Sequence, residues 1–169
     1  MIPPVSLDGV VVSSRMIRGL LAEGKAEEAR RFLGRPYCLE GGVQVGAGRG
    51  RELGFPTANV ALPEAPPLCD GVYAGRVLVR GGFQDAMMNL GCAPTFGPGA
   101  RRLEIHMPAW ETALYGERVV AFFLRRLRDE QRFASAQALA EQLGRDREAA
   151  EAVWQAARVL PWPEWTLHS

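Results

Sequence analysis

The sequence is poor in several features that would each point to a different class of protein. It has a single lysine, Lys25, and a net charge of +1, so no broad positive field favours nucleic acid or a membrane surface as partner. Its three cysteines are widely spaced and odd in number, which fits neither a zinc site nor a disulfide framework. No apolar run approaches the roughly 20 residues needed to cross a bilayer, and the N-terminus shows no signal-peptide pattern. We therefore expect a cytoplasmic protein with no nucleic acid and no membrane as partner.

The first part of the chain has a helical pattern. Ser13 or Ser14 can cap a helix that Gly24 ends, and a second short helix is predicted over about 26–33. With 169 residues and 47% apolar residues, the whole chain is long enough for one domain with a real core.

After this helical part the hydrophobic pattern changes to short β-rich segments separated by Gly and Pro turns. They lie at 39–45, 71–79, 85–90, 102–107 and 118–127. Five or six strands without an intervening helix predict a mainly β fold, an antiparallel barrel or a sandwich. A C-terminal helix capped by Ser135 is expected to pack on it. The tail carries Trp162 and Trp165, which dock on the body or on a partner.

Residues 46–60, GAGRGRELGFPTANV, are the most informative stretch. Glycines at Gly46, Gly48 and Gly50 let the backbone approach a bulky anion, and Arg49 and Arg51 offer cationic forks for phosphate oxygens. No Gly-Lys-Ser/Thr follows, so this is not the common phosphate loop. A glycine-rich surface loop without function is the alternative, which the glycines alone leave open. The rigid GFPTAN that follows favours the nucleotide site.

Thr57 and Asn59 are two residues apart, so in an extended segment their side-chain oxygens point the same way. A hydroxyl and an amide carbonyl on one face can share a hard ion such as Mg²⁺.

The segment 102–107 alternates: Leu103 and Ile105 face one way, and Glu104 and His106 face the other. A carboxylate beside an imidazole can transfer protons. The alternative is a solvated outer face, which alternation alone favours, with His106 as a hydrogen-bonding support rather than a metal ligand.

Several motifs in order along the chain carry a resemblance to a known family. They are LGRPYCLEGGVQVGAGRGRELGFPTANV, GVYAG, MMNLGCAPTFG, LEIHM, LYGE, LRDEQRF and QLGRD, and they cover about 33–146. Together they resemble the riboflavin kinase (flavokinase) module at the C-terminal end of bacterial bifunctional riboflavin kinase/FAD synthetases. The resemblance implies a six-stranded antiparallel Greek-key (riboflavin kinase-like) barrel with a C-terminal helix. It also implies transfer of the ATP γ-phosphate to the 5′-hydroxyl of riboflavin, giving FMN, with Mg²⁺ or another divalent cation.

The resemblance further implies roles for single residues. Thr57 and Asn59 would hold the divalent ion and the phosphates, and Glu104 would be the general base. The glycine loop from Gly46 would fold over ATP, and Tyr115 would line the nucleotide pocket. Arg128 and Phe133 would contact the flavin. As alternatives, both aromatic residues could be ordinary core residues and Arg128 a surface ion-pair partner.

Two departures from the family pattern matter. The segment 107–116, MPAWETALYG, lacks acidic residues usual after the Glu-x-His strand, which leaves a catalytically impaired flavin- or nucleotide-binding sensor module as the alternative function. Residues 1–36 resemble only the end of an FMN adenylyltransferase module. We therefore expect no FAD synthetase activity, and a separate FMN adenylyltransferase is a candidate partner. The expected organisation is a helical remnant at 1–36, the barrel and helix at 37–158, and a Trp/Pro tail at 159–169.

Overall fold

The computed structural model describes residues 5–45, 54–62, 65–92, 101–110, 112, 114–160 and 162.

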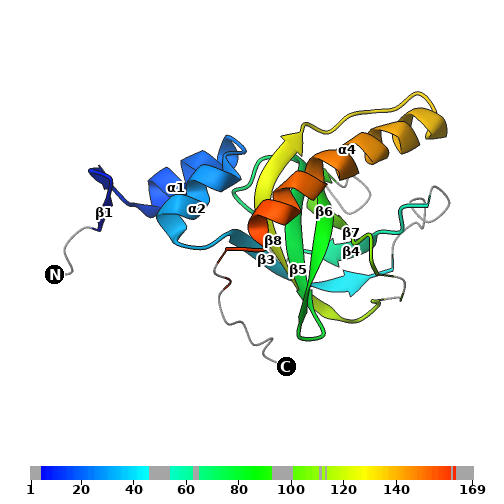
Figure 1. The fold of residues 1–169 in the computed structure, drawn as a ribbon, viewed down its shortest axis with the longest axis horizontal. Helices are drawn as coiled ribbons and strands as arrows, with labels where there is room; N and C mark the ends of the chain where they lie inside the picture. The colour runs from blue at the N-terminus through cyan, green and yellow to red at the C-terminus, as the bar shows by residue number, and fades with distance from the viewer. Residues whose placement is uncertain are drawn as a thin grey trace.

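Six strands form one closed antiparallel barrel (Figure 1). They are β3 (Tyr37–Gln44), β4 (Ala58–Ala61), β5 (Gly71–Val79), β6 (Gly82–Cys92), β7 (Arg101–His106) and β8 (Arg118–Arg128), and they neighbour one another in the order β3-β4-β7-β6-β5-β8. The predicted six-stranded barrel is confirmed, and the sandwich alternative is wrong. None of the five β-rich ranges in the sequence predicted the short strand β4.

The barrel interior is filled with side chains from every strand. Tyr73, Met88, Leu103 and Phe123 are all fully buried there. On β5, Gly75 has no side chain because a Cβ would overlap the backbone of the neighbouring β8 and the Met88 side chain. A packed interior leaves no room for a ligand, so any functional site must lie outside it or at an end.

The β5–β6 connection is a two-residue turn formed by Arg80 and Gly81. Arg80 has φ 48° and Gly81 has φ 76°. Positive φ at both central residues matches the twist of the flanking strands and is the geometry that tight hairpins prefer.

Two helices before the barrel close one of its ends. They are α1 (Ser14–Ala22), whose first turn is capped by Ser13, and α2 (Ala26–Leu33), as predicted. Leu21, Ala26 and Ala29 are buried in the same cluster as the barrel interior. A two-stranded ribbon of β1 (Ser6–Leu7) and β2 (Val10–Val11) precedes them.

The C-terminal helix α4 (Ala136–Ala157) lies on the outside of the barrel across β5, β6 and β8 (Figure 1). Its cap is Ser135, as predicted, since the side chain accepts a hydrogen bond from the Ala138 N–H at 3.1 Å. Trp154 packs on the sheet, and its indole N–H donates to the Ala86 carbonyl at 3.3 Å. Trp162 also docks on the body, with its ring centroid 5.0 Å from that of Phe83. In the described part of the chain, no helix has both the length and the apolar character that a membrane crossing requires.

The close approach at Gly75 predicts the cost of adding one methyl group. We expect Gly75→Ala to lower the free energy of unfolding by roughly 1–3 kcal/mol, because the Cβ has no free space. Gly144→Ala on α4 is the matched control, since nothing lies within 4 Å of its Cβ position. That change should stabilise the protein by about 0.5–1 kcal/mol. Denaturant unfolding measures both, and equal effects would contradict the packing described.

Candidate functional site

Three polar residues lie side by side on the outer face of three neighbouring strands. In the strand register Glu104 of β7 pairs with Asn59 of β4 on one side and with Asn89 of β6 on the other. Directly paired residues project from the same face, and neighbouring strands are about 4.8 Å apart. Leu103 and Ile105 point into the barrel, so these three residues point outward. We call Asn59, Glu104 and Asn89 the polar row.

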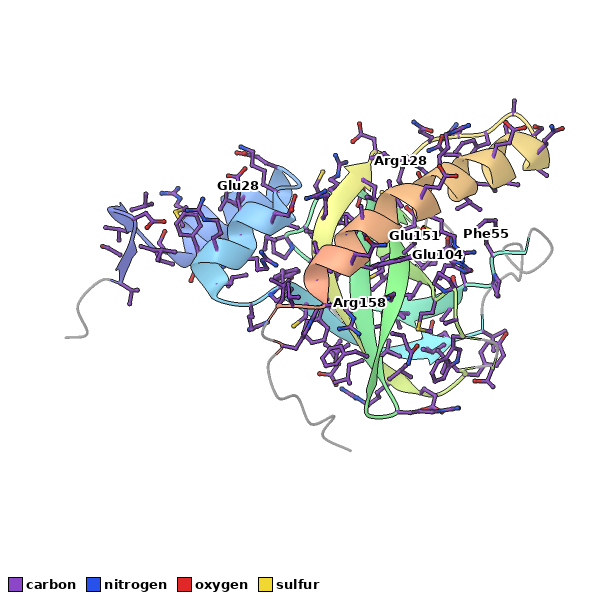
Figure 2. The ribbon with its side chains drawn as sticks, in the orientation of Figure 1. Glu28, Phe55, Glu104, Arg128, Glu151 and Arg158 are labelled. Atoms are coloured by element: carbon purple, nitrogen blue, oxygen red, sulfur yellow. The ribbon has the colours of Figure 1, made fainter. Side chains whose placement is uncertain are left out.

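The same line of paired residues continues across two more strands. Asn89 pairs with Val72 of β5, and Val72 pairs with Arg128 of β8. Glu104 and Arg128, both labelled in Figure 2, are therefore three strand spacings apart, roughly 14 Å along the sheet. The structure thus brings Asn59 directly beside Glu104 and places Arg128 at the far end of the line.

The Glu104 carboxylate is held in one direction but remains reachable. Arg102 lies 2.8 Å from its Oε1, and 28% of the Glu104 side chain is exposed. A carboxylate oriented by a neighbouring guanidinium and open to solvent can accept a proton from a bound hydroxyl. The solvated outer face and the proton-transfer role are therefore compatible at this residue.

His106 supports the segment that leads into β4. Its Nδ1 lies 2.9 Å from the Pro56 carbonyl oxygen, which can only accept, so Nδ1 carries the proton and donates. The centre of the Phe55 ring lies 5.2 Å from the centre of the His106 ring, and the two rings are tilted by 56°. Burial lowers the pKa of His106 below its ordinary value, an effect that the hydrogen bond to Pro56 opposes. The prediction that His106 is a hydrogen-bonding support is confirmed.

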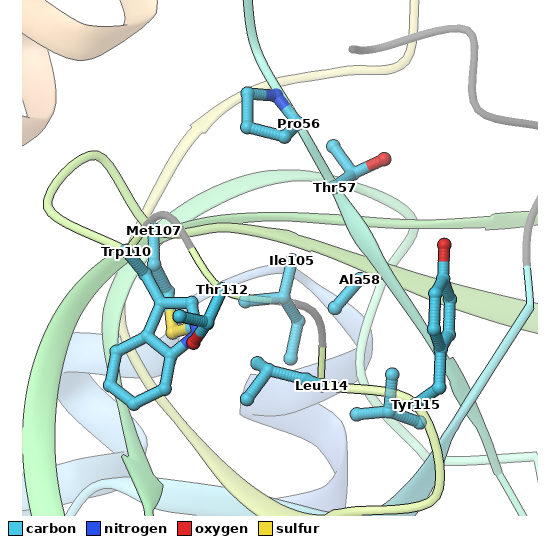
Figure 3. A pocket seen from close by; sticks show the side chains of 10 residues that line it. Pro56, Thr57, Ala58, Ile105, Met107, Trp110, Thr112, Leu114 and Tyr115 are labelled. Carbon is cyan, nitrogen blue, oxygen red and sulfur yellow. The ribbon is translucent and has the colours of Figure 1, made fainter.

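Thr57 and Tyr115 stand at the edge of a small cavity of about 70 Å³ (Figure 3). Its walls are otherwise largely apolar, with side chains of Val43, Ile105, Met107, Trp110 and Leu114. The Thr57 hydroxyl points away from Ile105 and Leu114 in this view. Small-molecule sites usually have about 300–1,000 Å³, so the described residues can line only part of one. An apolar slot with hydroxyl groups at its edge suits one portion of an aromatic, polar ligand.

Arg128 and Phe133 are brought together, and Arg128 also contacts α4. The Arg128 guanidinium donates to the Asp146 carboxylate at 2.7 and 2.9 Å and lies 5.7 Å from the centre of the Phe133 ring. Asp146 is buried and also accepts from Gln142 at 2.8 Å. The ion pair fastens the segment after β8 to α4. Arg128 thus forms an ion pair, but not the surface pair expected as the alternative, because only 14% of its side chain and 3% of that of Asp146 are exposed. Flavin contact stays a prediction for both Arg128 and Phe133.

The predicted phosphate-binding residues Gly46, Gly48, Arg49, Gly50 and Arg51 lie outside the described residues, and so does Trp165. The main residue that sequence reasoning missed is Asn89. It lies in the quoted motif MMNLGCAPTFG but was given no role. A single polar residue between apolar Met88 and Leu90 was the available signal.

The fold and the site define a small antiparallel barrel protein with a carboxylate-centred polar site on its outer face. The chain belongs to the riboflavin kinase family, because the family model "Flavokinase: Riboflavin kinase" matches residues 33–154. The resemblance found in the motifs is confirmed.

Curated relatives agree with this assignment. The bifunctional riboflavin kinase/FMN adenylyltransferase of Pseudomonas fluorescens is 40% identical over 150 residues, which are 88% of this chain and 48% of that protein. The protein of the same description from Escherichia coli K12 is 37% identical over 139 residues, covering 82% of this chain and 44% of the relative. The chain therefore spans about half the length of the curated relatives it matches.

Solved structures are similar as well. A crystal structure described as a macrolide-efflux protein from Streptococcus pneumoniae has a TM-score of 0.81 and 35% identity, over 89% of this chain and 50% of that one. Riboflavin kinase from Trypanosoma brucei has a TM-score of 0.56 and 22% identity, over 79% of this chain and 91% of that one. At this identity the second likeness concerns the fold alone, and it agrees with the barrel seen here.

The neutral, buried His106 predicts a pH dependence of stability. Because its pKa is lowered in the fold, the unfolded chain takes up a proton more readily, so stability is lost as the pH falls below about 6.5. We expect His106→Asn, whose amide can still donate to Pro56 but does not titrate, to show a smaller fall in Tm between about pH 7.5 and 5.5. An equal fall in both proteins would show that His106 is not responsible.

Proposed function

We propose that this chain is an ATP-dependent riboflavin kinase that transfers the γ-phosphate of ATP to the 5′-hydroxyl of riboflavin and yields FMN. The observation that carries the proposal is the position of Glu104. Glu104 on β7 pairs with Asn59 on the neighbouring strand β4. Thr57, which lines the small cavity, directly precedes β4. The candidate base and the candidate phosphate and metal site are thus on adjacent strands, which supports a reaction that depends on bringing a hydroxyl and a phosphate together.

Glu104 would act as general base. A sugar hydroxyl has a high pKa, so a carboxylate that receives its proton helps as the oxygen attacks the phosphorus. The Arg102 guanidinium keeps the carboxylate in place, and the exposed side lets the substrate reach it. The hydroxyl loses its proton to Glu104, its oxygen bonds to the γ-phosphorus, and ADP leaves with the electrons of the broken P–O bond.

Thr57 and Asn59 would hold Mg²⁺ together with the ATP phosphates. Their hydroxyl and amide oxygens are hard donors of the kind Mg²⁺ prefers. Among the described residues no group of three or more His, Cys, Asp or Glu side chains could hold a metal. The two oxygens would act together with water and phosphate, which is the usual way Mg²⁺ is bound with nucleotides. It would neutralise the charge on the transferred group.

The remaining predicted residues would contact the two substrates, ATP and riboflavin. Tyr115 and the apolar cavity would receive part of the nucleotide, with the loop at Gly46, Gly48, Arg49, Gly50 and Arg51 over the phosphates. Arg128 and Phe133 would contact the flavin ring. The distance of roughly 14 Å along the sheet between Glu104 and Arg128 suits a substrate whose reacting hydroxyl is at the end of a chain.

We further propose that these 169 residues make FMN but not FAD. The described residues before the barrel are a two-stranded ribbon and two short helices, one of which seals the core with Leu21. Such elements offer no second nucleotide-binding sheet. Adenylyl transfer to FMN would then need a separate protein or a separate module.

Replacing the base tests the reaction. We expect Glu104→Gln to lower kcat about 10²–10⁴-fold, because the amide cannot take the proton. Glu40→Gln on β3, which removes only an exposed pairing with Arg118, is the control and should leave kcat unchanged. Purified chain is incubated with ATP, Mg²⁺ and riboflavin, and the flavin products are separated. Binding of riboflavin without FMN formation in the unmutated chain would support the sensor alternative, and FAD in the products would contradict the proposed end point.

The metal is tested by removal. Excess EDTA should abolish FMN formation, and adding Mg²⁺ back should restore it, because the γ-phosphate charge is otherwise not neutralised. Thr57→Val, which keeps shape but removes the hydroxyl oxygen, should raise the Mg²⁺ concentration needed for half-maximal rate. Full activity in EDTA would overturn the metal role.

A further inference from the structure

Arg80 has a backbone conformation that glycine adopts freely and that is unfavourable for an arginine. It is the first residue of the β5–β6 turn, with φ 48°, and in the described part of the chain Asp8 is the other non-glycine residue with positive φ. A Cβ is disfavoured in this left-handed region, and tight hairpins usually have asparagine or glycine there. An arginine at such a position points to a role for its side chain.

The Arg80 side chain joins two segments that follow β7. Its Nε and Nη2 groups donate to Glu117 Oε1 at 2.9 and 2.7 Å, and its guanidinium carbon lies 5.6 Å from the centre of the Trp110 ring. The guanidinium thus contacts both a carboxylate and an aromatic ring, which are favourable partners for a cation. We call Arg80 and Glu117 the clamp.

The Trp110 ring forms one wall of the small apolar cavity, and the clamp helps to orient it. Its indole N–H is buried and has no hydrogen-bond partner among the described residues, so this group does not fix the ring. The orientation depends instead on packing against the barrel core and on Arg80. Trp110 lies on the opposite side of Leu114 from Tyr115 (Figure 3).

Glu117 also holds the other side of the cavity, through its backbone. Its N–H donates to the Leu114 carbonyl at 3.0 Å, and its carbonyl accepts from the Val43 N–H at 2.8 Å. The Gly116 N–H donates to the Val43 carbonyl at 3.0 Å, so the turn that carries Tyr115 is fastened to β3. Val43, Leu114 and Tyr115 all line the cavity. Glu117 therefore connects both sides of the cavity.

We propose that Arg80 and Glu117 are positioning residues for the nucleotide. They hold Trp110 and the turn at 114–117 together, and so keep the cavity in the shape that receives the base of ATP. The inference rests on the proposed function, in which this cavity takes part of the nucleotide. A planar base suits apolar walls with aromatic side chains. Neither clamp residue lines the cavity, so both act through other residues.

The main test is Arg80→Gly, which removes the side chain and relieves the backbone. Glycine is favoured at positive φ, and an exposed ion pair contributes little to stability, so Tm should stay the same or rise. The KM for ATP should nevertheless rise about 3–10-fold, while kcat and the KM for riboflavin stay within about twofold. A merely structural role would change Tm and activity in the same direction. Thermal unfolding and kinetics with each substrate varied in turn measure these quantities.

Glu117 is tested in the same assay. Glu117→Ala should raise the KM for ATP as Arg80→Gly does. Glu117→Gln keeps an oxygen that can accept from Arg80 and should restore most of the affinity. Glu27→Ala is the matched control, because it removes a similar exposed pairing with Arg125 and neither of these residues lines the cavity. It should leave both KM values unchanged.

A double variant shows whether the clamp acts through Trp110. Trp110→Leu should itself raise the KM for ATP. Adding Arg80→Gly should then change this KM by less than about twofold, because the ring that Arg80 holds is gone. A further severalfold rise in the double variant would contradict action through Trp110.

Two outcomes would overturn the inference while leaving the kinase function intact. One is an unchanged KM for ATP in a folded Arg80→Gly protein, and the other is an equal rise in the KM for both substrates. By contrast, a chain that makes no FMN argues against the proposed function itself. Calorimetry then still tests the inference, because a non-hydrolysable ATP analogue should bind about 3–10-fold more weakly to Arg80→Gly than to the unmutated chain.

Discussion

The pairing of β7 between β4 and β6 is the constraint on which the site depends. Because side chains alternate along a strand, a register shift by one residue would turn Leu103 and Ile105 outward and Glu104 into the core. The apolar interior forbids that shift, since it would expose two fully buried side chains and bury a carboxylate. The packing of the core thus specifies the position of Glu104, and with it the alignment of Asn59 and Asn89.

A solid barrel explains why the chemistry lies on the outer face. Six strands enclose only enough space for their own side chains, and Tyr73, Met88 and Phe123 fill it. Functional groups must then come from the outward-facing residues of the strands and from segments that pack on them. Helix α4 and the segment after β8 are such packed segments, and Glu130 of the latter lies against Gly91 of β6, the strand that carries Asn89.

Two hydrogen-bonded supports connect these outer segments to the barrel. His106 holds Pro56, so the chain enters β4 in a defined direction just before Thr57. Arg128 holds Asp146, so the segment carrying Glu130 and Phe133 stays next to α4. Breaking such a buried ion pair is more damaging than its net contribution to stability suggests, because one charge would be left without a partner. The supports therefore act mainly on where the site residues lie.

Much of this protein follows from local sequence. The caps at Ser13 and Ser135, the Arg80-Gly81 turn, the alternation around Glu104 and the family motifs determine the helices, most strands and the candidate base, because each depends on neighbours a few residues away. Only the tertiary structure decided which strands are adjacent. It alone placed Asn89 beside Glu104, Glu130 over Gly91 and Arg128 on Asp146, because these contacts join residues brought together by barrel closure and packing.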